Sequence, residues 1–510
     1  MKLLGLLSFI CTVLLIGCCR FFVDLKYFYN YVYHKYVYDK SIYGEYLMIF
    51  DRELELKVLQ DAATSGKAEL IVVYGRRRIG KTTVIREFLS KVNGVYLFTP
   101  RGSIEDILSV FSEDVREQTG EFVAFSDWQS FLQYIKMKSK SKFIVAIDEF
   151  QRISEAYPPA MTLLQHYWDS YLSNSKIILI LIGSVVGMIE KIALLGDSPL
   201  FGRKTRELKI DVIPYLITRR FWRKYSEEEK IEAYGFFGGT PGYFTLVDDS
   251  ITPLENVENL ILAPSARLSN EPEYLLTEET RTPSTYMSIL FQISQGKRGL
   301  PLSKIKTRRG TPTVYLRTLN KMGIIDRLES LAQGNRIYIM ADEFFRFWFK
   351  FIYPRQSLLE AKKGYLIKSK IEDEKSDYLS FTFEKILREL VIFSSGRELK
   401  GVKIPIVEKI GSYWWREIEV DVCATAKDTV VVGEAKWKSK TIEKSDVETL
   451  IKKMHHVKEK LKKNHAIGII VTKGGITKEA RNMEGNNIIL FDLNELRSTL
   501  DNIYSGNYET

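Results

Sequence analysis

A short segment near residue 75 most constrains what this chain can fold into. Residues 71–74 are apolar, a Gly-x-x-x-x-Gly-Lys-Thr loop runs from Gly75 to Thr82, and residues 83–89 carry apolar side chains at helical spacing. A strand, a glycine loop and a helix in this order predict a phosphate-binding P-loop. Gly75 and Gly80 let backbone amides face inward, and the start of the helix adds positive charge where phosphates bind.

The side chains of this loop have defined expected roles. Lys81 should reach the β- and γ-phosphates of ATP, and the hydroxyl of Thr82 should ligate Mg²⁺. ATP and Mg²⁺ are therefore the expected cofactors. The residues expected to form the nucleotide site here are Gly75, Arg76, Arg77, Arg78, Ile79, Gly80, Lys81, Thr82 and Thr83.

A second segment, residues 143–150, reads as a buried strand that ends in two acids, Asp148 and Glu149. Asp148 is expected to hold Mg²⁺ through water, and Glu149 to orient and deprotonate the attacking water. An ordinary strand with acids at its end is the alternative. Together with the P-loop, this pattern predicts an ATP hydrolase with Lys81 and Glu149 among its catalytic residues.

Two further catalytic candidates follow. Ser184 comes after the apolar strand at 176–182, where a polar residue senses the γ-phosphate in additional-strand ATPases; a helix N-cap is the alternative, because residues 185–194 look helical. Arg203 lies in a glycine-flanked loop and is a candidate arginine finger, in cis or toward a neighbouring subunit of a homo-oligomer. A solvated surface arginine is the alternative for Arg203.

Composition limits the partners and the compartment. The net charge of +10 indicates an anionic partner but does not distinguish nucleic acid from a membrane. Apart from three cysteines between residues 11 and 19, the chain has only Cys423, so its body cannot hold a disulfide framework. This usage fits a reducing compartment, and the expected location is the cytoplasm.

The first 47 residues differ from the rest of the chain. Residues 3–19 are uncharged and apolar, and residues 27–46 carry eight tyrosines. Three interpretations stay open: a membrane anchor, a signal peptide, or residues that precede a true start at Met48. A membrane is an expected partner only if residues 1–47 are retained.

The chain resembles a family of P-loop ATPases found mainly in archaea, in the signal-transducing (STAND) branch related to AAA+ proteins. The resemblance runs from about Met48 to the C-terminus. It rests on Phe50-Asp51-Arg52-Glu53, the P-loop, Asp148-Glu149-Phe150-Gln151, Gly183-Ser184, the stretch from Ser198 to Arg203, Gly239-Thr240-Pro241 and Glu271-Pro272. In that branch a Gly-x-Pro element touches the nucleotide, which implies this role for Gly239 and Pro241. The implied fold is α/β, with an additional-strand, RecA/AAA+-like P-loop core at 48–215 and a helical lid at 216–281.

Residues 282–355 are expected to form a winged helix followed by an aromatic linker. Helical patterns at 285–295, 301–306 and 313–322 precede two strand patterns at 324–328 and 336–340. Such a module can place a recognition helix in a DNA groove, or serve only for packing and protein contacts. Its basic edge consists of Lys304, Lys306, Arg308, Arg309 and Arg317.

Residues 356–510 carry a second group of chemically active residue types. Glu384 lies in a helical pattern, Asp421 in one predicted strand, and Glu434 and Lys436 in the next. Strand residues two apart share a face, so Glu434 and Lys436 point the same way, and pairing of the two strands would bring in Asp421. Carboxylate oxygens hold hard metal ions that activate water for phosphodiester cleavage, so the three carboxylates are expected to share one divalent ion.

This arrangement resembles the PD-(D/E)xK nuclease fold, which the same ATPase family carries at this place. A nuclease-like fold without activity is the alternative. Residues 436–463 contain ten lysines and four acids, which suits a DNA backbone or a solvated helix face. The predicted function is an ATP-dependent switch coupled to a DNA-binding or nuclease-like effector. A DNA-remodelling motor and a membrane-tethered protein-interaction ATPase are the alternatives.

Overall fold

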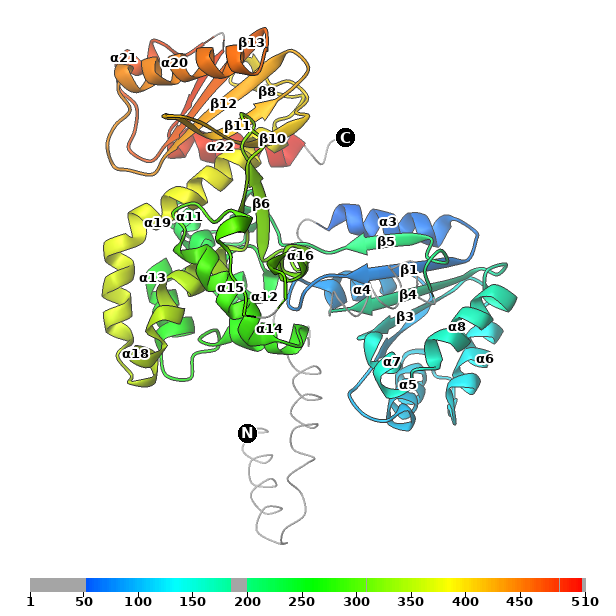
Figure 1. Cartoon of the computed structure of the whole chain (residues 1–510). Helices are drawn as coiled ribbons and strands as arrows, with labels where there is room; N and C mark the ends of the chain where they lie inside the picture. The colour runs from blue at the N-terminus through cyan, green and yellow to red at the C-terminus, as the bar shows by residue number, and fades with distance from the viewer. Residues whose placement is uncertain (1–51, 185–199, 309, 486, 507–510) are drawn as a thin grey trace. The chain divides into compact units, whose positions relative to one another are not determined.

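The structure, a computed structural model, describes residues 52–184, 200–308, 310–485 and 487–506 (Figure 1). The chain divides into two compact units, Met1–Phe50 and Asp51–Thr510, and all the described residues belong to the second. The apolar segment at 3–19, the helix expected at 185–194 and Arg309 lie outside the described residues.

A five-stranded parallel sheet forms the core of the region that carries the P-loop. Its strands are β1 (Glu69–Tyr74), β2 (Gly94–Phe98), β3 (Phe143–Asp148), β4 (Ile177–Gly183) and β5 (Arg206–Lys209), in the order β2-β3-β4-β1-β5. Strand β4 lies between β1, which leads into the P-loop, and β3, which carries Asp148. This is the predicted additional-strand arrangement, and it confirms the α/β P-loop core.

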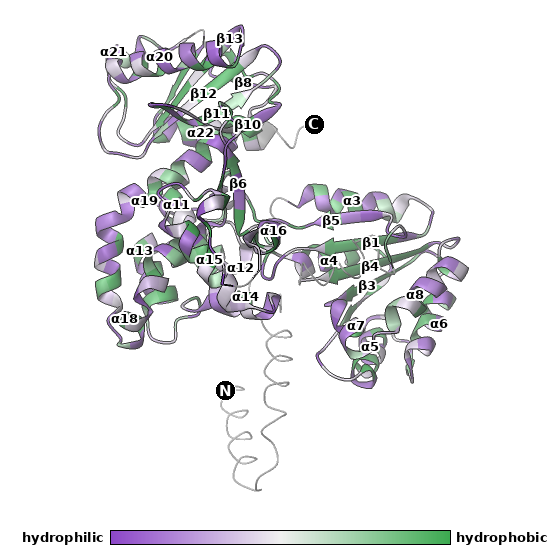
Figure 2. Ribbon diagram, viewed as in Figure 1, coloured by the Kyte–Doolittle hydropathy of each residue, from purple (hydrophilic) through white to green (hydrophobic). Residues whose placement is uncertain are grey.

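Both faces of this sheet are covered, because successive side chains of a strand point to opposite faces. Ile71 and Val73 of β1 pack on one side with α3 (Glu53–Thr64) and α4 (Lys81–Leu89). Leu70 and Val72 pack on the other side. The elements there are α5 (Ile104–Thr119), α6 (Trp128–Lys138), α7 (Gln151–Ala156), α8 (Ala160–Tyr167) and the π-helical turn η1 (Trp168–Leu172). Strands β1 to β4 are accordingly apolar along most of their length, whereas the edge strand β5 is largely hydrophilic (Figure 2).

Between residues 215 and 279 the regular structure is helical. The elements are α10 (Tyr215–Thr218), α11 (Glu227–Phe237), α12 (Pro241–Phe244), α13 (Pro253–Val257), η3 (Glu258–Leu262) and α14 (Glu271–Glu279). Ser226 and Thr252 begin α11 and α13 with capping boxes, in which the hydroxyl accepts from the third helical amide. Helix α11 carries buried residues on all sides, so it lies inside this region rather than on its surface.

The next region has the predicted order of helices and a hairpin. It contains α15 (Pro283–Gln295), η4 (Leu302–Lys304), α16 (Pro312–Lys321), and the antiparallel strands β6 (Ile325–Glu329) and β7 (Arg336–Met340). The helix expected at 301–306 was wrong in length: only η4, a short 3₁₀ turn, forms. Ile305 ends the turn because it adopts extended backbone angles and buries its side chain.

An aromatic stretch then leads into a long helix. It comprises α17 (Glu343–Phe347), η5 (Trp348–Ile352), η6 (Tyr353–Arg355) and α18 (Gln356–Glu360). Helix α19 (Gly364–Phe393) follows with 30 residues, much longer than the helical pattern around Glu384 indicated. Because α19 is continuous, it joins the aromatic stretch to the acidic residues of the C-terminal region.

A second five-stranded sheet forms the C-terminal region. Its order is β10-β11-β12-β13-β14, with antiparallel pairing from β10 to β12 and parallel pairing from β12 to β14. Leu387 of α19 packs at Gly433 on one face, and Leu450 of α20 packs at Gly468 on the other. The elements are β8 (Glu398–Leu399), β9 (Val402–Lys403), β10 (Lys409–Trp415), β11 (Ile418–Thr425), β12 (Thr429–Lys436), α20 (Lys444–Lys460), β13 (His465–Thr472), α21 (Lys478–Arg481), β14 (Ile488–Phe491) and α22 (Leu493–Gly506).

The predicted localisation, cytoplasmic with a possible membrane anchor, is contradicted by the length and the composition of the helices. In the ranges that the structure describes, no helix is long and apolar enough to cross a membrane. Helix α19 has the length for a span, but charged residues recur along it, which a bilayer core does not tolerate.

Candidate ATP site and C-terminal acid cluster

The P-loop is formed where β1 ends at Tyr74 and α4 begins at Lys81. A Cβ atom at Gly75 would lie 2.4 Å from the carbonyl oxygen of Ile210, so only glycine fits this close approach. Gly80 has a φ of 92°, in the left-handed region that glycine adopts without strain, and it directly precedes α4. The amides at the start of α4 therefore face the loop, as phosphate binding requires.

Lys81 is buried within the loop. Its Nζ donates hydrogen bonds to the carbonyl oxygens of Gly75 (2.7 Å) and Arg76 (2.8 Å). Burial lowers the pKa of Lys81, although the nearby acids Glu279 and Glu149 favour its charged form. The ammonium group is thus held in the position from which a P-loop lysine contacts phosphate.

Thr82 and Asp148 lie together, as the sequence predicted. The Thr82 hydroxyl donates a 2.8 Å hydrogen bond to Oδ2 of Asp148, and the hydroxyl of Tyr96 donates to the same oxygen. The backbone amide of Glu149 donates to Oδ1 of Asp148 at 2.8 Å. A hydroxyl and a carboxylate in contact are hard oxygen donors, the type that Mg²⁺ prefers.

Glu149 is held on several sides. Ser184 Oγ lies 2.9 Å and 3.0 Å from its two carboxylate oxygens, and the side-chain amide of Gln151 donates to Oε2 at 2.7 Å. Burial raises the pKa of Glu149, but the charges of Arg152 and Arg77 lower it. The lowering outweighs the effect of burial, so the pKa of Glu149 lies below its usual value. The residue has a φ of 53°, a left-handed conformation uncommon for glutamate and frequent at functional sites.

The structure gives Ser184 and Arg203 particular neighbours. Ser184 is buried beside Glu149, so it lies in the site as predicted, while its role toward the γ-phosphate stays a prediction. Arg203 precedes β5, and its guanidinium donates two 2.8 Å hydrogen bonds to Asp169 of η1. Its role as an arginine finger also stays a prediction.

The Gly-Thr-Pro element lies against the P-loop. A Cβ atom at Gly80 would lie 4.0 Å from Cγ of Pro241, and the amide of Gly242 donates a 3.0 Å hydrogen bond to the carbonyl oxygen of Arg78. At Gly239, a Cβ atom would lie 1.7 Å from the carbonyl oxygen of Ile213, so glycine is required there. This close packing brings residues 239–242 beside the expected nucleotide position.

Sequence reasoning missed several residues that contact the P-loop arginines. Arg76 is buried and its Nη2 donates to Asp342 and to the hydroxyl of Thr240. Arg77 and Arg78 form ion pairs with acids of α14: Glu278 at 3.3 Å and Glu271 at 3.0 Å. Only Thr240 and Glu271 carried a signal in the sequence, because both belong to motifs of the resemblance. Asp342 and Glu278 lie in no motif.

The strand order, the P-loop and the paired acids at the end of β3 define a P-loop NTPase. Residues 49–247 match a family model described as an ATPase domain predominantly from Archaea. Residues 348–450 match a second model, described as archaeal and bacterial proteins of unknown function.

Three comparisons extend over most of a known protein. The uncharacterized protein MJECL04 of Methanocaldococcus jannaschii is 32% identical over 466 residues, which are 88% of this chain and 100% of that protein. The Walker-type ATPase PABY2304 of Pyrococcus abyssi is 22% identical, with a TM-score of 0.43, 59% of this chain and 96% of that chain covered. The ORC2 protein of Aeropyrum pernix is 14% identical, with a TM-score of 0.39, 63% of this chain and 93% of that chain covered.

This chain belongs to the family of P-loop ATPases found predominantly in Archaea. It is an ATP hydrolase, and the predictions of ATP binding and ATP hydrolysis are confirmed.

The C-terminal acids are partly brought together. Strands β11 and β12 pair in antiparallel fashion, as expected, and Oδ2 of Asp421 accepts a 3.0 Å hydrogen bond from the amide of Ala435. Nη2 of Arg298 donates to Glu384 Oε1 at 3.0 Å and to Asp421 Oδ1 at 2.9 Å. This arginine comes from the segment after α15, and a second nitrogen of its guanidinium pairs with Glu419.

Glu434 is held by lysines instead. Lys436 donates to its Oε2 at 3.1 Å, and Lys453 of α20 donates to its Oε1 at 2.8 Å. Among the described residues, no three histidine, cysteine, aspartate or glutamate side chains gather closely enough to hold a metal ion. The expectation that Glu384, Asp421 and Glu434 share one ion is therefore not met in this arrangement. Glu384 and Asp421 converge on one nitrogen of Arg298, whereas Glu434 is paired with Lys436 and Lys453.

Proposed function

We propose that this ATPase is a switch in which Mg·ATP at the P-loop controls a DNA-binding, nuclease-like C-terminal module. The observation that carries the proposal is the buried ion pair between Arg76 of the P-loop and Asp342, which caps α17. Both side chains are 1% exposed, so the pair is shielded from solvent and sensitive to any displacement of the loop.

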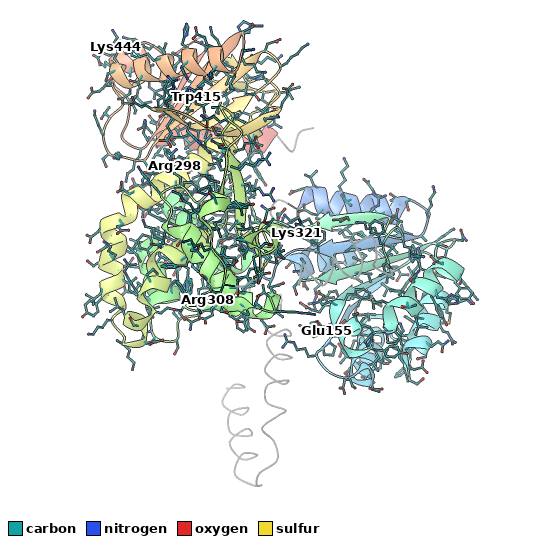
Figure 3. The ribbon with its side chains drawn as sticks, viewed as in Figure 1. Glu155, Arg298, Arg308, Lys321, Trp415 and Lys444 are labelled. Carbon is teal, nitrogen blue, oxygen red and sulfur yellow. The ribbon has the colours of Figure 1, made fainter. Side chains whose placement is uncertain are left out.

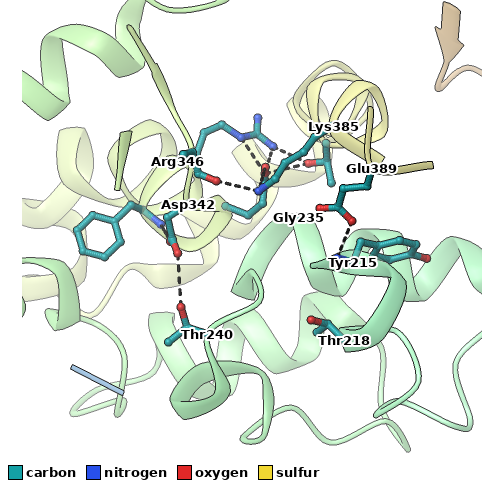
Figure 4. Close-up of polar contacts among 12 residues, drawn as sticks. Tyr215, Thr218, Gly235, Thr240, Asp342, Arg346, Lys385 and Glu389 are labelled. Atoms are coloured by element: carbon teal, nitrogen blue, oxygen red, sulfur yellow. Dashed lines mark hydrogen bonds and ion pairs between the residues drawn. The ribbon is translucent and has the colours of Figure 1, made fainter. Parts of the chain in front are cut away.

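The polar contacts continue from α17 to α19 (Figure 4). Glu343, next to Asp342, pairs with Arg346, and Thr382 of α19 donates to Glu343 at 3.1 Å. Lys385 of α19 donates to the carbonyl oxygen of Ala341 at 2.8 Å. Because α19 also carries Glu384, a rigid helix connects this network to the C-terminal acid cluster, which supports coupling between the two sites.

Thr82 and Asp148 are the residues that would hold Mg²⁺, and their contact fits that ion. The ion would neutralise charge on the phosphates during hydrolysis. Lys81 then binds the β- and γ-phosphates, and Glu149 accepts a proton from the attacking water. Ser184 and Gln151 orient that carboxylate.

DNA contact is supported by exposed cations on two elements. Residues 282–340 have the helix order and hairpin of a winged helix, and Lys304, Lys306, Arg308 and Arg317 are exposed on it. Helix α20 exposes further lysines, among them Lys444, labelled with Arg308 in Figure 3. Cations of this kind neutralise phosphates and release counterions.

The test is ATP hydrolysis by the full chain with and without single- and double-stranded DNA, followed by DNA cleavage assays with Mg²⁺ or Mn²⁺. The proposed switch predicts DNA-stimulated hydrolysis together with metal-dependent cleavage. Stimulation without cleavage would favour the second candidate, a DNA-remodelling motor whose nuclease-like domain is inactive; the exposed cations favour this candidate too. Hydrolysis that is unaffected by DNA would refute both.

A further inference from the structure

Helix α14 presents three carboxylates to the P-loop. Glu271 pairs with Arg78 at 3.0 Å, and Glu278 pairs with Arg77 at 3.3 Å. Positions seven and eight apart return to the same side of an α-helix after two turns, so Glu279 lies next to Glu278 on that side. One helix thus supplies acids to the cations that a P-loop offers to phosphate.

Glu279 differs from the other two acids. It is buried, and neither of its carboxylate oxygens accepts a hydrogen bond of normal geometry from the residues that the structure describes. A buried carboxylate without hydrogen bonds is costly, and native proteins retain such groups mostly where they have a role. Burial raises the pKa of Glu279 to about 8, although Lys81 and Arg77 lower it.

The groups that face Glu279 are those of the phosphate site. Lys81 and the Arg77 side chain attract it, Glu149 repels it, and the Arg77 amide lies close enough to lower its pKa. In a P-loop, the lysine and the loop amides contact the β- and γ-phosphates. The carboxylate of Glu279 and the terminal phosphate of ATP therefore compete for the same cations.

We infer that Glu279 is a further residue of the ATP site, one that determines its discrimination between ATP and ADP. Binding of the γ-phosphate brings negative charge against Glu279, so the carboxylate must take up a proton or move away with the end of α14. ADP lacks that phosphate and leaves Glu279 in place. Helix α14 is followed directly by α15, so such a movement would reach the region that carries Arg298.

The experiment compares Glu279→Gln with Glu273→Gln, an exposed position on the same helix. Glutamine keeps the size of the side chain and removes the charge. Calorimetric titration of the full chain at pH 9, where the wild-type carboxyl of Glu279 is ionised, should show that Glu279→Gln binds ATP about tenfold more tightly than wild type, because two nearby like charges repel each other. ADP affinity should stay within about twofold of wild type, and Glu273→Gln should change neither constant.

Equal changes in ATP and ADP affinity, or no change in either, would overturn the inference, since a merely structural carboxylate has no preference between the nucleotides. A measurement on the wild-type chain covers the case in which Glu279→Gln does not fold. A non-hydrolysable ATP analogue, unlike ADP, should either raise hydrogen exchange in the amides of α14 or be bound with uptake of a proton, which calorimetry in buffers of different ionisation enthalpy measures. Identical exchange and identical proton uptake with both nucleotides would together overturn the inference.

Discussion

Arg76 and Asp342, 266 residues apart in the chain, form a buried ion pair that joins the P-loop to helix α17. The other oxygen of Asp342 accepts a 2.8 Å hydrogen bond from the amide of Phe345 and so caps that helix. One carboxylate therefore fixes both the nucleotide loop and the start of the aromatic segment. Thr240, of the Gly-Thr-Pro element, accepts from the same guanidinium, which places three distant segments around one charge.

Asp342→Ala should destabilise the protein strongly, because it leaves the Arg76 guanidinium buried without its partner. Breaking one side of a buried pair usually lowers the free energy of unfolding by about 3–5 kcal/mol. Denaturant unfolding of the full chain measures the change. Asp373→Ala, at an exposed position of α19, is the control and should stay within about 0.5 kcal/mol of wild type. A similar effect of the two variants would mean that the pair contributes little.

Glu149→Gln should bind ATP but hydrolyse it on the order of 10²- to 10⁴-fold more slowly, the usual effect of removing a positioned base. Lys81→Ala should abolish detectable nucleotide binding, because the phosphates lose their main cation. Steady-state hydrolysis and ATP titration measure both effects. Glu155→Gln, an exposed glutamate of α7, is the matched control. Wild-type rates from Glu149→Gln would exclude it as the base.

The stability of the α19 region should depend on pH through Glu389. Burial raises the pKa of Glu389 to about 7, against hydrogen bonds from the amides of Tyr215 and Leu216. The folded-state pKa exceeds the unfolded value, so the stabilising contribution is complete below about pH 4.5 and is lost as the pH rises through 7. Glu389→Gln should remove this dependence, and at pH 8 it should be more stable than wild type by roughly 2–3 kcal/mol.

Unfolding free energies at pH 5 and pH 8 test this expectation. Glu372→Gln, exposed on the same helix, should follow the wild-type pH profile. If Glu389→Gln shows the same dependence of stability on pH as wild type, a group other than Glu389 is responsible for that dependence.

Arg298→Ala should open the C-terminal acid cluster to divalent metal. Without its guanidinium, Glu384 and Asp421 lose their shared counter-charge, and an added cation can replace it. Calorimetry should show Mn²⁺ affinity about tenfold above wild type, a modest fraction of the attraction between a dication and two carboxylates. Arg336→Ala, at an exposed position of strand β7, is the control.

Asp421→Ala combined with Arg298→Ala should abolish the gain in Mn²⁺ affinity. If the module cleaves DNA, Asp421→Ala and Lys436→Ala should each remove cleavage while ATP hydrolysis continues. If Arg298→Ala binds Mn²⁺ no more tightly than wild type, Glu384 and Asp421 serve only to bind positively charged side chains of the protein.

The sequence by itself determined the ATP site in its essentials. Local sequence rules place five of its residues: Gly75, Lys81, Thr82, Asp148 and Glu149. The P-loop is one continuous segment, and the two acids follow a strand whose carboxyl end lies at the same edge of the parallel sheet as that of the P-loop strand. The order of helices and hairpin after residue 282 was also predictable, since each element has its own periodicity.

Tertiary structure decided which distant charges meet. Asp342, Glu279 and Arg298 lie in no motif, and their partners are brought to them only by the packing of helices and sheets from other parts of the chain. The same packing paired Glu384 with Arg298 and Glu434 with Lys453. The pair between Glu434 and Lys436 is local, because both residues lie on the same face of β12. A pattern of acids on adjacent strands specifies where their backbones lie, whereas the cations that approach from the segment after α15 and from α20 decide what the carboxylates bind.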